Sequence, residues 1–240
     1  FLKNFFKREE LLVVQTSLTH YSVKKAADLT DLEIVDSSLE SSHWGMSPEL
    51  LEETILSFYR KGKKGFLIPL TLGYTITGSD DPVEKISAVL EKIKKSHSDI
   101  QFFVWIDAAF SGIVKPFIEN NFSPFSLPFI QAFITDFHKF PAVPYSSGLV
   151  LYKKNLLKNI EKNVAYIGRK DTTLLGSRPG MASIILWYIL QSLGKSGFKK
   201  MIDQALEKKR KFIEEIEKEL PSARIITTPE SVQIGVLPRT

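Results

Sequence analysis

Two residues in the middle of the chain have the types and the spacing for amine chemistry. Asp107 follows the apolar run FFVWI, and Lys139 follows AFITDFH, 32 residues later. A carboxylate at the end of a buried strand is costly unless a cation faces it. A lysine amine can form a Schiff base when it is partly desolvated or lies near another cation. The two side chains could therefore reach opposite edges of one flat, cationic heterocycle, although a helix N-cap or a Mg²⁺ ligand would also explain Asp107.

Three further residues stand close to this pair or follow another apolar run. His20 follows LLVVQTSLT, where an imidazole could stack on a flat ring, and the small Ala109 would leave room at the ring's other face. His138 directly precedes Lys139 and could donate to a phosphate. Each histidine also has an ordinary explanation. His20 could be a hydrogen-bonded loop residue, and His138 with Lys139 could form a surface loop.

Other common kinds of site lack their sequence signals. The chain has no cysteine, which excludes disulfides, thiolate metal sites and thiol nucleophiles. Its four histidines show no metal-ligand spacing, and we expect no metal site. No phosphate-binding glycine loop, nucleophile elbow or dinucleotide fingerprint is present. Asp80 and Asp81 precede Pro82 and a helical pattern, so we expect them to cap that helix rather than bind a metal.

The elements that must position these residues alternate along the chain. Apolar runs predict strands, and their nearly continuous hydrophobicity indicates burial on both faces. The predicted strands are Leu11–Thr16, Phe66–Leu72, Phe102–Ile106, Ala132–Thr135 and Gly148–Tyr152. The predicted helices are Val23–Leu29, Pro48–Arg60, Pro82–Ser96, Met181–Leu193 and Phe198–Leu220. This alternation predicts an α/β fold with a mostly parallel sheet and helices on both faces.

Ligands of such sheets bind beyond the carboxyl ends of the strands. Polar residues suited to chemistry follow several of the predicted strands, so we expect their side chains to meet at one edge. These segments are Thr16–His20, Thr71–Gly73, Asp107–Ala109 and Asp136–Lys139.

Six segments, taken in order, resemble the group II amino-acid decarboxylases that depend on pyridoxal phosphate (PLP). Any one of them is a weak signal, but six in order with the Asp-to-Lys spacing intact are specific. Within this family the chain looks most like bacterial PLP-type histidine decarboxylases. The segments are THYSVKKAA (19–27), TLGYTITGSDDP (71–82), WIDAAFSG (105–112), DFHKF (136–140), SSGLVLYKK (146–154) and TTLLGSRPG (172–180).

The resemblance implies roles around the cofactor ring. Lys139 would carry the cofactor as a Schiff base, and Asp107 would pair with the pyridine nitrogen and keep it protonated. His20 would stack on one face of the ring and help to position the departing or arriving group. Ala109 would pack on the other face, and Thr71 would lie near the ring hydroxyl.

The resemblance implies further roles near the phosphate and in a mobile loop. His138 and Asp136 would lie near the phosphate, and Tyr166, 27 residues after the lysine, would be the tyrosine of the mobile loop. Two residues depart from the family pattern: Tyr74 replaces a small hydroxyl residue, and Phe137 replaces a proline. The family's phosphate loop precedes the His20 strand, and the chain starts too late to include it.

The resemblance also implies an architecture and an activity. The fold would be the large domain of an aspartate-aminotransferase-like (fold type I) enzyme. We expect residues 1–220 to form this PLP-binding domain, without its N-terminal part, and residues 221–240 to begin a truncated small domain. The reaction would be decarboxylation of an L-amino acid, with histidine favoured and tyrosine, glutamate or another amino acid as alternatives. A carbon–carbon lyase of the sphingosine-phosphate type and a non-catalytic relative of the fold are the other readings.

Composition sets the expected partners. The chain is 43% hydrophobic and 25% charged, with a net charge of +5 from scattered lysines and arginines, so we expect no nucleic-acid partner. No apolar run approaches the roughly 18–20 residues of a membrane span. We expect a cytoplasmic enzyme with a small amino-acid substrate. The resemblance further implies a homodimer with its site at the subunit interface.

Overall fold

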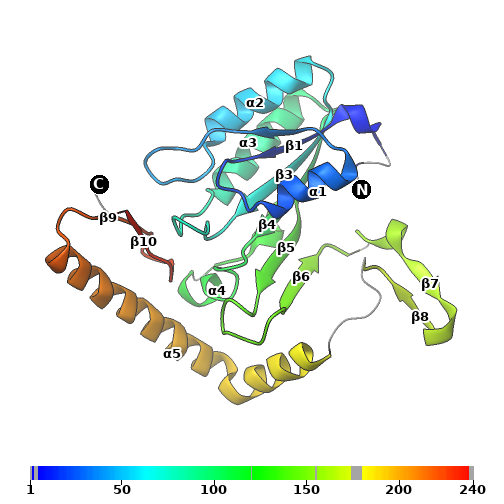
Figure 1. The fold of residues 1–240 in the computed structure, drawn as a ribbon. Coiled ribbons are helices and arrows are strands. Elements are labelled where there is room, and N and C mark those ends of the chain that lie inside the picture. The colour runs from blue at the N-terminus through cyan, green and yellow to red at the C-terminus, as the bar shows by residue number, and fades with distance from the viewer. Residues whose placement is uncertain (1, 3–4, 120, 155, 174–179, 238–240) are drawn as a thin grey trace.

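The computed structural model describes residues 2, 5–119, 121–154, 156–173 and 180–237, and it has a sheet at its centre (Figure 1). Within these residues the sheet has six strands in the order β2-β1-β3-β4-β5-β6. Neighbouring strands are parallel up to β5, and β6 runs antiparallel to β5. The predicted mostly parallel sheet is confirmed. Its strands are β1 (Leu11–Gln15), β2 (Ile34–Asp36), β3 (Gly65–Thr71), β4 (Gln101–Asp107), β5 (Ile130–Asp136) and β6 (Gly148–Tyr152).

Helices cover both faces of this sheet, as predicted (Figure 1). On one face, α2 (Pro48–Arg60) and α3 (Val83–Ser96) bury the main hydrophobic core against alternate residues of β3 and β4. On the other face, α1 (Ser22–Thr30) packs Val23 and Ala27 against β1. The sheet is therefore held from both sides, and the carboxyl ends of its parallel strands share one edge.

The two predicted helix starts have different outcomes. α2 begins as expected: the Ser47 side chain accepts a hydrogen bond from the Leu50 amide, and Pro48 occupies the first turn. The expected cap of α3 is wrong, because its N-cap is Pro82 and no side chain caps it. Asp81 instead turns inward and accepts hydrogen bonds from buried backbone amides and a phenol. A buried carboxylate is stabilised more by several such donors than by one exposed helix end.

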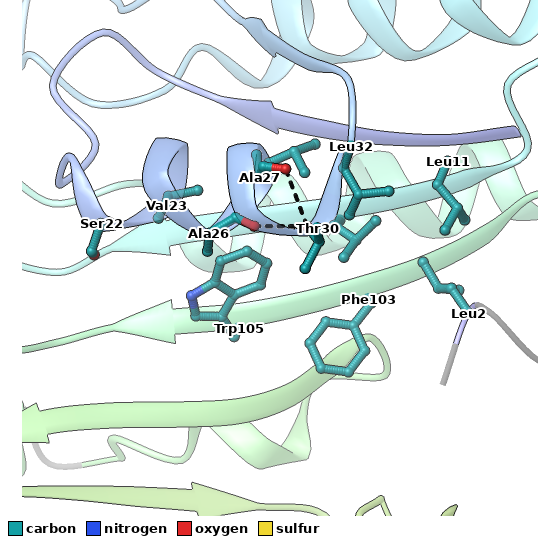
Figure 2. A pocket seen from close by; sticks show the side chains of 12 residues that line it. Leu2, Leu11, Ser22, Val23, Ala26, Ala27, Thr30, Leu32, Phe103 and Trp105 are labelled. Carbon is teal, nitrogen blue, oxygen red and sulfur yellow. Dashed lines mark hydrogen bonds between the residues drawn. The ribbon is translucent and has the colours of Figure 1, made fainter. Parts of the chain in front are cut away.

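Burial on both faces holds for only part of the sheet. β1 is buried along its whole length, whereas burial alternates along β4 and every residue of β6 is exposed. The half-buried side of β4 carries Phe103 and Trp105, which help to line an apolar cavity of about 570 Å³ beside α1 (Figure 2). The prediction of burial on both faces is therefore wrong for β4 and β6, since α1 covers only part of that side.

The C-terminal half lies largely outside the main sheet. α5 runs through the predicted break between two helices, and Gly194 marks the kink with a non-helical φ of 56°. The remaining elements are α4 (Lys115–Ile118), β7 (Lys162–Val164), β8 (Arg169–Asp171), α5 (Met181–Glu219), β9 (Arg224–Ile226) and β10 (Gly235–Leu237). Short 3₁₀ helices lie at Arg8–Glu10, Pro124–Ser126, Lys158–Ile160 and Ala165–Ile167. Residues 174–179 of the family-like segment TTLLGSRPG lie outside the described residues.

The β9–β10 hairpin returns to the edge of the sheet. Gln233 Nε2 donates to the Tyr74 and Thr75 carbonyl oxygens at 3.2 Å each, so the hairpin holds the loop after β3. The proposed domain boundary at residue 220 remains a prediction. Of the helices described, none has the length and apolar character to cross a membrane. In the same part of the chain, no group of three or more His, Asp or Glu side chains is placed to hold a metal ion.

Candidate active site

A cavity of about 200 Å³ opens at the carboxyl edge of the sheet, where the segments after β1, β3, β4 and β5 meet. It is smaller than the roughly 300–1,000 Å³ that encloses a drug-sized ligand, so it forms part of a site. Six of the eight residues singled out from the sequence line it. They are His20, Thr71, Asp107, Ala109, Asp136 and Lys139.

Asp107 ends β4 at the floor of this cavity, in register with Thr71 of β3. Burial raises the pKa of its carboxyl group. A 3.1 Å hydrogen bond from the Ala109 amide and the positive charges of Lys139 and His20 oppose that rise. Within the described part of the chain, no side chain forms an ion pair with this carboxylate. The site therefore offers a buried negative charge that a cationic ligand would stabilise.

Lys139 lies in the connection between β5 and β6 and places its amine between an acid and an aromatic ring. Its Nζ atom is 3.2 Å from the Asp136 carboxylate and 4.2 Å from the centroid of the Phe110 ring. Both contacts hold the amine at the cavity wall. Phe110 was not singled out from the sequence, where its only signal is its place directly after Ala109.

The two predicted site histidines have different surroundings. The His20 ring lies at the cavity, with its Nδ1 atom 2.8 Å from the Ser22 hydroxyl. His138 does not line the cavity. Its Nδ1 atom lies 2.7 Å from the Ser147 carbonyl oxygen and 3.3 Å from the Ser147 amide nitrogen, and its Nε2 atom lies 3.6 Å from Asp136. A phosphate role for His138 remains a prediction.

Two buried threonine hydroxyls near the cavity are left without a good hydrogen bond. The Thr71 hydroxyl lies near the Tyr74 phenol and works to lower the phenol's pKa, but no hydrogen bond of sound geometry joins them. The Thr135 hydroxyl, on β5, is unpaired as well. A buried unpaired hydroxyl is unfavourable, so these groups favour a polar ligand beside Thr71.

Tyr166 lies apart from the cavity. It belongs to the turn between β7 and β8, and 91% of its surface is exposed. The structure does not bring it to the other site residues, and its role remains a prediction. The larger cavity beside α1 contains no ionisable side chain, so the chemistry is assigned to the smaller one.

Comparisons with known proteins find amino-acid decarboxylases with a similar sequence or the same fold. Tryptophan decarboxylase of Clostridium sporogenes is 28% identical over 211 residues, which are 84% of this chain and 49% of that protein. Histidine decarboxylase of Mesorhizobium japonicum is 31% identical over 186 residues, 78% of this chain and 48% of that protein. The solved structure of Lactobacillus brevis glutamate decarboxylase superposes with a TM-score of 0.81 at 18% identity, over 96% of this chain and 52% of that one, which shows the shared fold.

The chain thus spans about half the length of the curated relatives it matches. A model of the conserved domain of pyridoxal-dependent decarboxylases matches residues 6–236, nearly the whole chain. The cofactor of this chain is accordingly pyridoxal phosphate, and the chain belongs to the pyridoxal-dependent decarboxylase family.

Proposed function

We propose that the protein removes the α-carboxylate of an L-amino acid as carbon dioxide, with histidine as the favoured substrate. The observation that carries this proposal is the meeting of Lys139, Asp107 and His20 at one cavity in a chain of this family. The relatives' names include both histidine and tryptophan decarboxylases, so a substrate with a ring in its side chain is consistent with them.

The described residues fit pyridoxal phosphate. Lys139 offers an amine to hold its aldehyde carbon, Asp107 offers a buried negative charge to its ring nitrogen, and Thr71 offers its hydroxyl to the ring oxygen. When bound, the cofactor supplies a protonated ring that accepts the electron pair released as carbon dioxide leaves. His20 and Ala109 line the cavity and would enclose the two faces of that ring.

The chain's own groups have separate tasks in this scheme. Asp107 would hold a proton at the ring nitrogen, because its carboxylate is buried and no cation among the described residues forms an ion pair with it. Asp136, 3.2 Å from the Lys139 amine, is placed to take the proton that the amine must lose before it can act as a nucleophile. His20 positions the departing carboxylate above the ring plane.

The first experiment tests the lysine in the full-length protein. Wild-type protein with PLP should show an absorbance band in the visible or near-ultraviolet that borohydride removes, and Lys139→Ala should lack this band. Lys154→Ala, which changes an exposed lysine two residues after β6, is the matched control and should keep the band. A Lys139→Ala protein with an unchanged band would contradict the assignment.

The second experiment tests the reaction and the substrate. Carbon dioxide release is measured with histidine, tyrosine, tryptophan and glutamate, and histidine should give the fastest release. Release from none of them would overturn the decarboxylase proposal. Cleavage of a phosphorylated long-chain amino alcohol without carbon dioxide would favour the carbon–carbon lyase, and loss of both reactions with a normal fold would favour a non-catalytic relative.

A homodimer with a shared site is part of the proposal. Tyr166 is exposed in its own subunit and could serve the cavity of a partner. Mixed dimers of Lys139→Ala and Tyr166→Phe subunits should then recover part of the activity, because one of their two sites has both residues intact. Mixed dimers without any recovered activity would exclude a Tyr166 that acts across the subunit interface, and a fully active Tyr166→Phe homodimer would place Tyr166 outside the reaction.

A further inference from the structure

Tyr74 is a buried polar residue at the wall of the cavity. It follows Gly73, whose φ of +86° favours glycine, in the turn after β3, and only 1% of its surface is exposed. The turn closes on itself, since the Tyr74 amide donates to the Ser79 carbonyl oxygen. Tyr74 thus has a fixed backbone, and its phenol reaches the interior from there.

The phenol connects two separate segments of the site. Its oxygen lies 2.9 Å from the Thr16 hydroxyl, after β1, and 3.0 Å from each oxygen of the Asp81 carboxylate. Asp81 in turn accepts a 2.6 Å hydrogen bond from the Thr71 amide, at the end of β3. Thr16 and Thr19 are linked three times: their hydroxyls lie 3.1 Å apart, the Thr16 amide donates to the Thr19 hydroxyl at 3.0 Å, and the Thr19 amide donates to the Thr16 carbonyl oxygen at 3.1 Å.

The carboxylate fixes the direction of these hydrogen bonds. Burial raises the pKa of Asp81 to about 6, against hydrogen bonds from the Met46 and Thr71 amides, so the group is ionised at neutral pH and can only accept. Burial and the nearby carboxylate raise the pKa of Tyr74, so the phenol stays protonated and donates a hydrogen bond to Asp81. Thr16 must then donate to the phenol oxygen, and Thr19 to Thr16.

This chain of hydrogen bonds ends one residue before His20. Thr19 is 9% exposed and Thr16 is fully buried, so neither hydroxyl has free access to water as an alternative partner. The Tyr74 hydroxyl therefore adds a buried side-chain link between the His20 segment and the end of β3.

We propose that Tyr74 is a positioning residue, whose hydroxyl fixes the His20 segment against the end of β3 and so sets the height of the imidazole above the cofactor ring. This inference rests on the proposed function for its effect on the reaction. Its structural part concerns only residues of this chain.

The test uses the full-length protein and three variants. Tyr74→Phe and Thr16→Val each remove one hydroxyl from the chain of hydrogen bonds and keep the shape of the side chain. Tyr59→Phe is the matched control, because Tyr59 on α2 also donates to an aspartate, Asp99 at 3.0 Å, but through a hydrogen bond that is exposed to solvent. With four histidines in the sequence, the His20 imidazole signal can be assigned by NMR from a His20→Gln sample.

In the cofactor-free protein, the His20 signal should shift in Tyr74→Phe and in Thr16→Val but not in Tyr59→Phe. In the enzyme loaded with cofactor, kcat should fall about tenfold in Tyr74→Phe and in Thr16→Val, and KM should change less than twofold. The kcat of the variant with both substitutions should fall no further, because the two hydroxyls act as one unit.

An unchanged His20 signal in a folded Tyr74→Phe protein overturns the proposal, as do additive effects of the two substitutions on kcat. Should Tyr74→Phe not fold, Thr16→Val decides by the same two measurements. If wild-type protein releases no carbon dioxide from any amino acid, the proposed function fails, while the His20 signal still decides the positioning.

Discussion

Two pairs of aspartates lie at the same edge of the sheet, and the protein treats them differently. Asp80 and Asp81 accept hydrogen bonds from the Gly73, Met46 and Thr71 amides, and Asp80 also pairs with Lys115 at 2.5 Å. We call this group, with Tyr74, the β3 clamp.

In the cavity, by contrast, Asp107 accepts one backbone hydrogen bond and Asp136 contacts the Lys139 amine, which we propose holds the cofactor. A carboxylate with all its partners inside the chain holds structure. A carboxylate without them marks the place of a ligand.

The largest effect should come from the unpaired cavity carboxylate. In the proposed scheme, Asp107→Asn removes the charge that would keep the cofactor's ring nitrogen protonated, so kcat/KM should fall about 1,000-fold. The melting temperature should stay within a few degrees of wild type, because the side chain holds little of the fold together. Asp99→Asn, at an exposed position, serves as the control and should keep full activity. A Asp107→Asn enzyme with near-normal activity would remove the contrast between the two pairs.

The second effect is a pH dependence of stability from the clamp. Asp81 has a pKa of about 6 in the folded protein, above its ordinary value of 3.8, so its carboxylate binds a proton more tightly in the folded chain than in the unfolded chain. The stability from this group is therefore fully present below pH 4 and is lost as the pH rises through 6. The rise in pKa corresponds to about 3 kcal/mol. Chemical unfolding of wild type and Asp81→Asn between pH 4 and 8 measures it, and a constant difference between the two proteins would contradict the expectation.

A third effect tests the cation of the clamp. Burial works to lower the pKa of Lys115, but attraction to Asp80 and Glu119 outweighs it and the net change is a rise. Lys115→Met leaves Asp80 without its cation. Because Asp80 keeps 20% of its side chain exposed and keeps the Gly73 amide, we expect a loss of about 2 kcal/mol in the free energy of unfolding, below the value for a fully buried pair.

The matched control for this substitution is Lys199→Met. Lys199 pairs with Asp203 on α5 at the same i,i+4 spacing as Lys115 with Glu119, but about half of each side chain is exposed. Its removal should change the free energy of unfolding by less than about 0.5 kcal/mol. Equal losses in the two variants would show that burial does not separate the clamp from the surface.

The smallest effect should come from the second cavity aspartate. The Asp136–Lys139 pair is less buried than the Asp80–Lys115 pair, because Lys139 keeps 24% of its side chain exposed and Lys115 only 9%. Asp136→Asn should therefore alter the free energy of unfolding by less than about 0.5 kcal/mol. Thermal unfolding of the cofactor-free protein measures this, and a loss as large as that of Lys115→Met would assign Asp136 to the structural group.

Sequence patterns predict the elements of this protein better than the contacts between them. The order of strands and helices and the meeting of Asp107 with Lys139 follow from local apolar runs and from the rule for parallel sheets. The predicted capping role of Asp81 was wrong, although Asp-Pro before a helix is a typical capping signal. Its actual partners include the Met46 amide, which is distant in the sequence, and the Tyr74 phenol, which a capping pattern does not indicate. A local pattern carries no information on such long-range hydrogen bonds.

The exposure of β6 has the same origin. Its apolar run predicts a buried strand, but burial depends on what lies against it, and α1 does not extend over this part of the sheet. The short β2, which has three residues, was missed because so brief a segment shows no clear period.

The edge formed by β6 has a consequence for handling the molecule. Among the described strands only β5 pairs with it, and Leu149, Val150 and Leu151 are each more than a third exposed. An apolar strand with an open row of backbone donors and acceptors is a template for another such strand. We therefore expect copies of residues 1–240 to associate edge to edge through β6, and this association should increase with protein concentration.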